Sequence, residues 1–336
     1  MYELCTDIGY VTLTKTGEQL CGDHVELVQQ ADGSVVLVLA DGLGSGVKAN
    51  ILSTLTGKII STMIANGLTL EDWVSTIAAT LPVCAERKVA YSTFTILRIV
   101  DCAEAELIQY DNPHTILLRR GKHVDYPEIC ENIDGKNIYK SRMRLWEGDV
   151  LVAMSDGALN ASQGNTLNMG WDRAAIIDFL ETMYNDSFTA KTWAAMLVEE
   201  CERLYGGQPG DDTSACVIRL RRRQVVNLLF GPPEKREDTN KMLSLFFAKE
   251  GKRIVCGGTT SELAAAYLGK PLDTSMPLYL DPKIPPTSKL QGVDLVTEGV
   301  ITMAKVLEYA EDYVKENRLY MDWSCKKDGA SQIARM

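Results

Sequence analysis

The sequence predicts an α+β protein in which stacked sheets with flanking helices are followed by a smaller parallel α/β domain. Strand-like runs dominate the first two thirds of the chain without a regular alternation of strand and helix. Helical patterns in that part come in neighbouring pairs. After the basic run at residues 221–223, strands and helices alternate, which is typical of a parallel sheet. We therefore expect one domain at residues 1–223, a second at 224–318 and a tail without periodicity at 319–336.

The elements of the first domain follow from the period of its apolar residues. Alternating or continuous apolar runs predict strands at residues 9–15, 24–30, 34–40, 90–100, 105–110, 115–120, 137–145, 150–154 and 213–220. Apolar residues at every third and fourth position predict helices at residues 45–66, 70–81, 172–184 and 190–205. Gly67 ends the first helix and Pro82 follows the second. This content favours sheets packed face to face, with the helices outside them.

Three units of strand and helix predict the parallel sheet of the second domain. Apolar strands at residues 225–230, 253–256 and 293–296 each lead through a short loop into a helical pattern. The carboxyl ends of parallel strands meet at one edge of a sheet, where ligands tend to bind. One of these loops has the composition of an anion-binding loop and consists of Gly257, Gly258, Thr259, Thr260 and Ser261. The alternative is a helix-capping turn, because the same residue types cap helices and the loop lacks the lysine of a P-loop.

The composition excludes several classes of protein. Asp and Glu total 45 against 35 Lys and Arg, and the whole net charge of −10 lies in residues 1–223. That balance argues against a protein that coats nucleic acid or an anionic membrane. No apolar run approaches the roughly 20 residues of a membrane span, and the first residues do not resemble a secretory signal. The nine cysteines form no CxxC pair and the three histidines lack zinc-ligand spacing, so free thiols in the cytoplasm are expected.

Acidic residues stand where four strands of the first domain begin or end. Asp41 and Asp156 each follow an apolar run and precede a glycine. Asp23 precedes a strand, and so do Asp211 and Asp212. A carboxylate beside a dry core is costly unless a partner neutralises it, and several carboxylates together raise one another's pKa. Oxygen ligands of this kind suit Mg²⁺ or Mn²⁺, which would polarise a phosphoryl oxygen and lower the pKa of a water molecule.

Each Asp-Gly pair also has a simpler interpretation as a turn. Asp-Gly is a common turn sequence, and we expect Asp32-Gly33 and Asp134-Gly135 to be turns only. The metal hypothesis therefore depends on the four acidic positions as a group, and on the apolar strands that lead into two of them.

Three segments resemble a known family. LADGLGSGVKAN, at residues 39–50, resembles the second motif of bacterial SpoIIE-type serine/threonine phosphatases of the metal-dependent PP2C superfamily. GDVLVAMSDGALNA, at 148–161, and GDDTSACVIRL, at 210–220, resemble the later Asp-Gly motif and the closing motif of that family. The motifs occur in the family's order, and the match covers about residues 4–220. The resemblance implies an αββα sandwich that hydrolyses phosphoserine or phosphothreonine on proteins by attack of metal-bound water.

The resemblance also implies roles for individual residues. The implied ligands of two Mn²⁺ or Mg²⁺ ions are the side chains of Asp23, Asp41, Asp156 and Asp211 and the carbonyl of Gly42. Asp212 stands where the family has Asn or Asp, and is expected to be a ligand or to lie just behind the ligands. His24 replaces the small hydroxyl residue of many relatives, and is either a general acid for the leaving alkoxide or a packed histidine. No arginine precedes Asp23 where eukaryotic relatives have one that binds phosphate, and this absence fits the SpoIIE type. Lys15 is the nearest cation, and the simple interpretation is a solvated strand residue.

The leading interpretation is a cytoplasmic, metal-dependent serine/threonine protein phosphatase whose substrate is a phosphorylated regulatory protein. Nucleic acid and membranes are not expected as partners. The second domain is expected to be a sensory or regulatory module. One rival is a non-catalytic scaffold with a phosphatase fold that binds a partner, and another is a phosphatase of small metabolites with the same metal site. A homodimer and a small-molecule effector of the second domain are left open.

Overall fold

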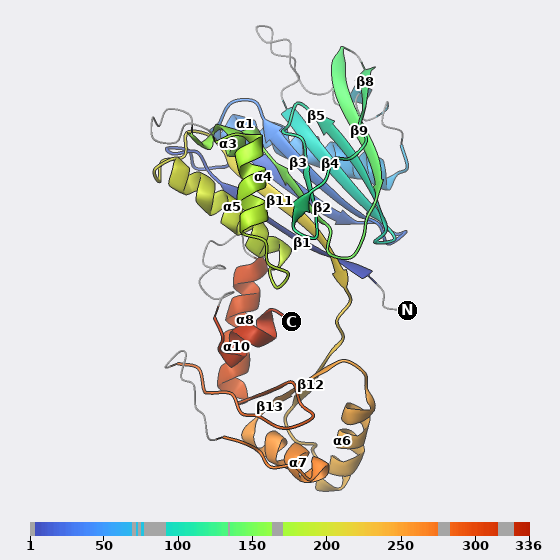
Figure 1. Cartoon of the computed structure of the whole chain (residues 1–336), viewed down its shortest axis with the longest axis vertical. Helices are drawn as coiled ribbons and strands as arrows, with labels where there is room; N and C mark the ends of the chain where they lie inside the picture. Colours follow the sequence, from blue (N-terminus) through green and yellow to red (C-terminus); the bar gives the residue numbers. More distant parts are fainter. Residues whose placement is uncertain are drawn as a thin grey trace. The chain divides into compact units, whose positions relative to one another are not determined.

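Two compact units make up the chain, Met1–Arg222 and Arg223–Met336, and Figure 1 labels most of their elements. The computed structural model describes residues 4–68, 72, 75–76, 92–133, 135–162, 171–274, 283–314 and 326–336. Most of the expected helix at residues 70–81, and the expected turn residue Asp134, lie outside the described residues. None of the helices in the described ranges combines the length and the hydrophobicity needed to cross a membrane.

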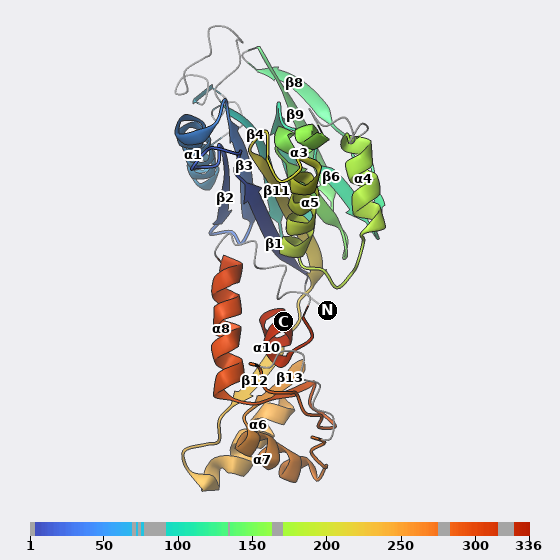
Figure 2. The same cartoon turned by 90° about the vertical axis from the view of Figure 1, so that its left-hand side faces the viewer.

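The first unit contains two antiparallel sheets stacked face to face (Figure 2). The strands of the five-stranded sheet are, in spatial order, β1 (Leu4–Leu13), β11 (Thr213–Arg222), β10 (Val150–Met154), β6 (Ile116–Arg119) and β7 (Lys122–His123). Those of the six-stranded sheet are β2 (Asp23–Gln29), β3 (Val35–Gly42), β4 (Ser92–Val100), β5 (Glu104–Tyr110), β9 (Lys136–Arg144) and β8 (Ile129–Ile133). Figure 2 shows α1 (Gly46–Ala65) on one side of the sheets, and α4 (Arg173–Thr182) and α5 (Ala190–Leu204) on the other. This arrangement confirms the expected α+β fold with an αββα sandwich.

Alternation along the strands separates the core between the sheets from the core under α1. In β3, Leu37 and Leu39 belong to the core between the sheets, whereas Val36 and Val38 pack with α1. Other members of the core between the sheets are Leu97, Ile99, Leu107, Leu117, Leu151 and Ile218. Burial of each such side chain contributes about 1.5–3 kcal/mol. A slip of β3 by one residue would exchange its leucines and valines between the two cores, so the packing of both cores fixes the register of this strand.

The backbone of α5 lies directly against β1. A Cβ atom on Gly9 would lie 2.2 Å from the backbone nitrogen of Lys191, so any side chain at this position would meet the helix. The helix begins at a capped end, because the Thr189 side chain accepts a hydrogen bond from the Thr192 N–H at 3.2 Å. Trp193, on the same helix, is only 1% exposed. A glycine in β1 therefore allows the close contact that seals this face of the five-stranded sheet.

The second unit is built on a three-stranded parallel sheet in the order β12 (Val226–Phe230), β13 (Lys252–Cys256) and β14 (Leu295–Thr297). The helices that follow these strands are α6 (Thr239–Ala248, after the short η2, Arg236–Asp238), α7 (Gly258–Leu268) and α8 (Val300–Val314). Leu243 and Phe246 of α6 pack with Ala264 of α7 on one face of the sheet. On the other face, Met303 of α8 packs with Ile254. The strand-and-helix alternation after residue 223 is therefore a parallel sheet covered on both faces.

The structure differs from the sequence prediction in short and terminal elements. β7 and β8 were not predicted, because β7 has two residues and β8 is largely exposed, without an apolar alternation. α3 (Asp156–Leu159) and η1 (Asn160–Ser162) are also too short for a periodic pattern. The sequence predicted a tail without periodicity at residues 319–336, but the described part of this segment contains α10 (Gly329–Ala334). Ala330 of α10 is buried against Tyr309 of α8, so this segment belongs to the core of the second unit.

Candidate active site

One cavity of the first unit, with a volume of about 540 Å³, collects residues that are far apart in the sequence. Its walls include the end of β3 and the loop into α1, the start of β4 and the start of α3. The lining residues are Lys15, Asp41, Gly42, Leu43, Gly44, Ser45, Ser92, Thr93, Asp111, Asp156 and Asp211. Of the predicted metal ligands, Asp41, Gly42, Asp156 and Asp211 therefore line one cavity.

Asp41 reaches the cavity because it continues the inward-facing row of β3. That row contains Leu37, Leu39 and then Asp41, so the alternation that buries two leucines also brings a carboxylate to the rim of the dry core. Antiparallel pairing places Asp23 of β2 directly opposite Asp41. Side chains paired in this way share one face of the sheet and lie about 5 Å apart at Cβ. The register of two strands thus brings two of the predicted ligands together.

Asp23 is a buried carboxylate whose oxygens have no well-aligned hydrogen-bond donor among the described residues. Its residue is 4% exposed, and neither Oδ atom accepts a hydrogen bond of good geometry from the described part of the chain. Burial raises the pKa of Asp23 to about 7; the hydroxyls of Ser214 and Ser155 oppose the rise, and the charges of two neighbouring carboxylates add to it. An unpartnered buried carboxylate is costly, and a bound cation would remove that cost.

Asp41 and Asp156 interact directly. Burial raises the pKa of Asp41 to about 10, and the charges of neighbouring carboxylates, Asp23 first, add to the rise together with a hydrogen bond to Asp156. Burial also raises the pKa of Asp156, whereas hydrogen bonds from Asp41 and the Gly157 N–H oppose it. Carboxylates in such close contact cannot all be charged without a counter-ion.

The loop before β11 contributes Asp211 and Asp212. Burial raises the pKa of Asp211, and the charge of Asp156 adds to the rise. Asp211 accepts a hydrogen bond from the Asp212 N–H at 3.0 Å. Asp212 is 4% exposed; its Oδ1 accepts a hydrogen bond from the Lys15 backbone N–H at 2.9 Å, and its Oδ2 has no partner within the described ranges. Asp212 thus lies behind the cavity wall, whereas Asp211 lines the cavity.

Two charged residues of the cavity wall had a weak signal in the sequence. Asp111 follows β5, so it repeats the pattern of an apolar strand followed by Asp, but Asn-Pro comes after it instead of glycine. Its φ of 56° is in the left-handed region, which Asp tolerates better than most residues. Lys15 is the only cationic side chain that lines the cavity among the residues that the structure describes, and its charge opposes the burial-driven rise in the pKa of Asp211.

His24 lies on the face of β2 opposite to Asp23, because successive side chains of a strand alternate. Its Nε2 is 3.1 Å from one carboxylate oxygen of Glu26, and Lys58 of α1 donates to the other oxygen at 2.7 Å. A Cβ atom on Gly57 of α1 would lie 3.0 Å from the His24 ring. The structure therefore packs His24 under α1 and does not bring it to the carboxylates of the cavity.

In the predicted anion-binding loop of the second unit, Gly257 and Ser261 form hydrogen bonds with backbone groups of the same unit. The Gly257 N–H donates to the Thr297 carbonyl at 2.9 Å. The Ser261 N–H and hydroxyl both donate to the Gly257 carbonyl, at 2.9 and 2.8 Å. Thr260 and Ser261 are buried, and a Cβ atom on Gly299 would lie 3.4 Å from the Gly257 Cα, so two loops meet at the carboxyl edge of the sheet. These bonds fit a helix start, and binding at Gly258 and Thr259 stays a prediction.

The donor set around the cavity fits a hard divalent cation. Within the described ranges, no three acidic, histidine or cysteine side chains already form a ready-made metal site. However, the side chains that meet here offer only oxygen ligands, and Asp23 and Asp212 contain buried oxygens without partners. Burial and neighbouring carboxylates raise the pKa of Asp23 and of Asp41, as expected for acidic groups that meet without a compensating cation. Both features are what a Mg²⁺ or Mn²⁺ ion would satisfy.

Comparison with known proteins gives a family match over most of the first unit. The family model for stage II sporulation protein E (SpoIIE) matches residues 31–221. The stage II sporulation protein E of Bacillus subtilis (strain 168) is 24% identical over 218 residues, which is 63% of this chain and 25% of that protein.

Solved structures share the fold of the first unit at low sequence identity. A structure of the PP2C phosphatase domain and a fragment of the regulatory domain of Bacillus subtilis SpoIIE has a TM-score of 0.57 at 19% identity, and covers 67% of this chain and 66% of that chain. Another structure of the SpoIIE phosphatase domain has a TM-score of 0.52 at 19% identity, with 67% and 96% covered. The RsbU and RsbW domains of a Mycobacterium tuberculosis protein give a TM-score of 0.54 at 16% identity, with 74% and 71% covered.

Proposed function

Because this chain belongs to the SpoIIE family, whose model spans more than half of it, we propose that its first unit is a metal-dependent phosphatase that acts on phosphoserine or phosphothreonine of a regulatory protein. The observation that best supports the proposal is that Asp41, Asp156 and Asp211 come from separate elements to line one cavity, and that Asp23 is paired directly opposite Asp41. The chain covers 25% of the length of its Bacillus subtilis relative, so the substrate and the partners are part of the proposal.

In this proposal the carboxylates hold one or two Mn²⁺ or Mg²⁺ ions. The holding groups are the side chains of Asp23, Asp41, Asp156 and Asp211 and the carbonyl of Gly42. Asp212 lies behind them and orients the loop through its hydrogen bond with the Lys15 backbone. The bound ions would polarise a phosphoryl oxygen and lower the pKa of a water molecule.

Lys15 is the residue of the cavity that suits an anionic substrate. A phosphoester dianion is repelled by several carboxylates, and Lys15 is a cationic residue that lines the same cavity. A charge-assisted hydrogen bond from Lys15 to a phosphoryl oxygen would orient the ester in the cavity. His24 has no part in this arrangement, because it lies under α1.

Phosphate release in the presence of Mn²⁺ tests the proposal. With a protein phosphorylated on serine or threonine as substrate, we expect Asp41→Asn and Asp156→Asn to lower turnover by about 100-fold or more, because even the partners of metal ligands contribute about 10–100-fold. Chelation of the metal by EDTA should abolish the wild-type activity, and Mn²⁺ should restore it.

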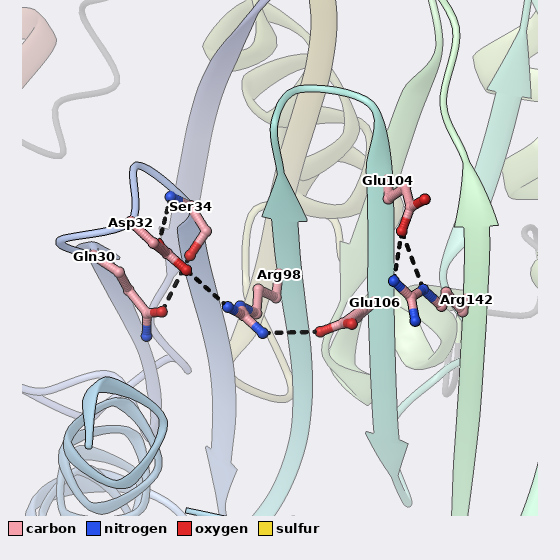
Figure 3. Close-up of polar contacts among 7 residues, drawn as sticks. All are labelled: Gln30, Asp32, Ser34, Arg98, Glu104, Glu106 and Arg142. Atoms are coloured by element: carbon pink, nitrogen blue, oxygen red, sulfur yellow. Dashed lines mark hydrogen bonds and ion pairs between the residues drawn. The ribbon is translucent and has the colours of Figure 1, made fainter. Parts of the chain in front are cut away.

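Asp32→Asn is a matched control from the same sheet. Asp32 lies at the turn between β2 and β3, at the far end of β3 from Asp41. Figure 3 shows its carboxylate with the Ser34 N–H, at 2.8 Å, and with the Arg98 guanidinium, at 3.0 Å. This variant should keep wild-type turnover. Lack of metal-dependent release from any phosphoester would instead support the scaffold, and faster release from sugar or nucleotide phosphates would support the metabolite phosphatase.

We extend the proposal to the second unit as a regulatory module of a cytoplasmic enzyme. The observation behind it is that this unit has its own sheet and core, and that its loops meet at the carboxyl edge of β13 and β14. Such edges are common ligand sites in parallel sheets, and a small-molecule effector would bind there. A homodimer stays a prediction.

A further inference from the structure

Tyr205, which directly follows the last residue of α5, contacts both of the loops that contain the later carboxylates. Its phenol hydroxyl donates a hydrogen bond to the Gly157 carbonyl at 2.8 Å. Its ring lies against Gly210, because a Cβ atom on that glycine would be 3.5 Å from the ring Cε1. Gly157 directly follows Asp156, and Gly210 directly precedes Asp211. One half-buried side chain thus touches the neighbours of two proposed metal ligands.

The two loops also pack on each other without space for adjustment. A Cβ atom on Gly157 would lie 2.1 Å from the Asp212 carbonyl oxygen and 2.6 Å from the Thr213 hydroxyl. The Thr213 hydroxyl donates to the Asp211 carbonyl at 3.3 Å. The backbone of the Asp156 turn therefore rests on the backbone of the Asp211 loop, and Tyr205 supports this contact from the α5 side.

The helix gives Tyr205 a rigid position from which to support the loops. The Tyr205 N–H donates to the Cys201 carbonyl at 2.9 Å, so the residue continues the hydrogen bonding of α5. Cys201 is buried, and its Sγ lies 3.8 Å from the Ala158 carbonyl oxygen, one residue beyond Gly157. α5 therefore contacts the Asp156 turn at two successive carbonyls, one through Cys201 and one through Tyr205.

We propose that Tyr205 is a positioning residue that holds the Asp156 turn and the Asp211 loop in one arrangement, so that both carboxylates face the same cation. The inference rests on the proposed metal-dependent function, and adds a residue that no motif contains. Tyr205 touches no reacting atom and acts through Gly157 and Gly210. Partners that orient metal ligands in this way contribute about 10–100-fold to metal affinity.

The test is Mn²⁺ binding to the full chain without substrate, measured from the electron paramagnetic resonance signal of free Mn²⁺. We expect Tyr205→Phe, which loses only the hydroxyl, to bind Mn²⁺ about 10-fold more weakly. At saturating Mn²⁺ its KM for the phosphoester should be unchanged. Tyr184→Phe is the matched control, because its hydroxyl bonds to Asp186 in an exposed loop and should leave Mn²⁺ affinity at the wild-type value.

A second variant keeps the inference testable if Tyr205→Phe does not fold. Thr213→Val preserves shape and removes the hydroxyl between the same two loops, so it should also weaken Mn²⁺ binding. If Tyr205→Phe folds and binds Mn²⁺ with wild-type affinity, this inference is overturned and the proposed function stands. If only Thr213→Val folds, wild-type affinity in that variant has the same consequence. A wild-type chain that binds no Mn²⁺ would overturn both.

Discussion

At the scale of single residues, the buried carboxylates connect the stability of the first unit to pH. Burial raises the pKa of Asp23 from 3.8 to about 7, and burial with neighbouring charge raises that of Asp41 to about 10. The folded state therefore binds protons more tightly than the unfolded state. This contribution to stability is complete below pH 3.8 and is lost as pH rises through about 7 for Asp23, then through about 10 for Asp41.

We therefore expect the thermal midpoint of the first unit in EDTA to fall as pH rises from about 5 to 8. Each unit of pKa shift corresponds to about 1.4 kcal/mol. Calorimetry across this range checks the slope. Asp23→Asn, which cannot ionise, should show a smaller slope, and a wild-type midpoint that rises over the same range would contradict the argument.

The residues of the candidate site differ in how far the sequence predicts them. Asp41 and Asp156 are visible because an apolar strand, an Asp and a glycine follow one another. Lys15 and Tyr205 reach the site only through the packing of the turns and helices that contain them. No periodicity in the sequence encodes such contacts between distant segments, and His24 shows the converse: it neighbours Asp23 in the sequence but lies on the opposite face of the strand.

At the scale of elements, the close contact between β1 and α5 predicts the effect of a single methyl group. In Gly9→Ala the new Cβ atom would lie 2.2 Å from the Lys191 nitrogen, so strand and helix must move apart. We expect a loss of about 1–3 kcal/mol in the free energy of unfolding, as for other overpacked cores. Urea unfolding followed by tryptophan fluorescence, to which buried Trp193 contributes, measures it.

Gly210→Ala is the comparison for this experiment. Its Cβ atom would lie 3.5 Å from the ring of Tyr205, which is an ordinary contact distance. The change in unfolding free energy should stay within about 0.5 kcal/mol. Equal effects of the two alanines would show that the contact between β1 and α5 is looser than described.

The strands and helices that the sequence predicts correctly have strong periodicity. β3 and β10 are continuous apolar runs, and α5 has an apolar stripe over four turns. The elements that were missed lack that signal. β8 is mostly exposed, and α10 is a helix of 6 residues whose burial depends on α8. Whether such short elements form depends on packing against residues that are distant in the sequence, and no local pattern predicts that packing.

At the scale of the whole molecule, the two units have separate cores. The hydrophobic clusters of the first unit contain no described residue beyond 222, and those of the second contain none before 223. We expect calorimetry to show two unfolding transitions. Mn²⁺ at about 100 times its dissociation constant should stabilise only the first unit, by about 2.7 kcal/mol.

A single unfolding transition, or a Mn²⁺-induced shift of both transitions, would contradict the prediction that the two units unfold independently.

The change from strands with paired helices to a strand-and-helix alternation near residue 223 was visible in the sequence. The role of the second unit was not, because its loops consist of residue types that serve helix starts and ligands equally.

The hairpin between β2 and β3 has a consequence for how the chain tolerates insertions. Its tip, where the Gly33 N–H bonds to the Gln30 carbonyl, aligns the strands so that Asp23 faces Asp41 at the other end. One extra residue at this exposed tip would shift the alignment by a step and turn one acidic group toward α1. The length of this surface turn thus sets the register that pairs the two acidic residues. Insertions or deletions at the turn would have to contain an even number of residues to keep both side chains on the same face.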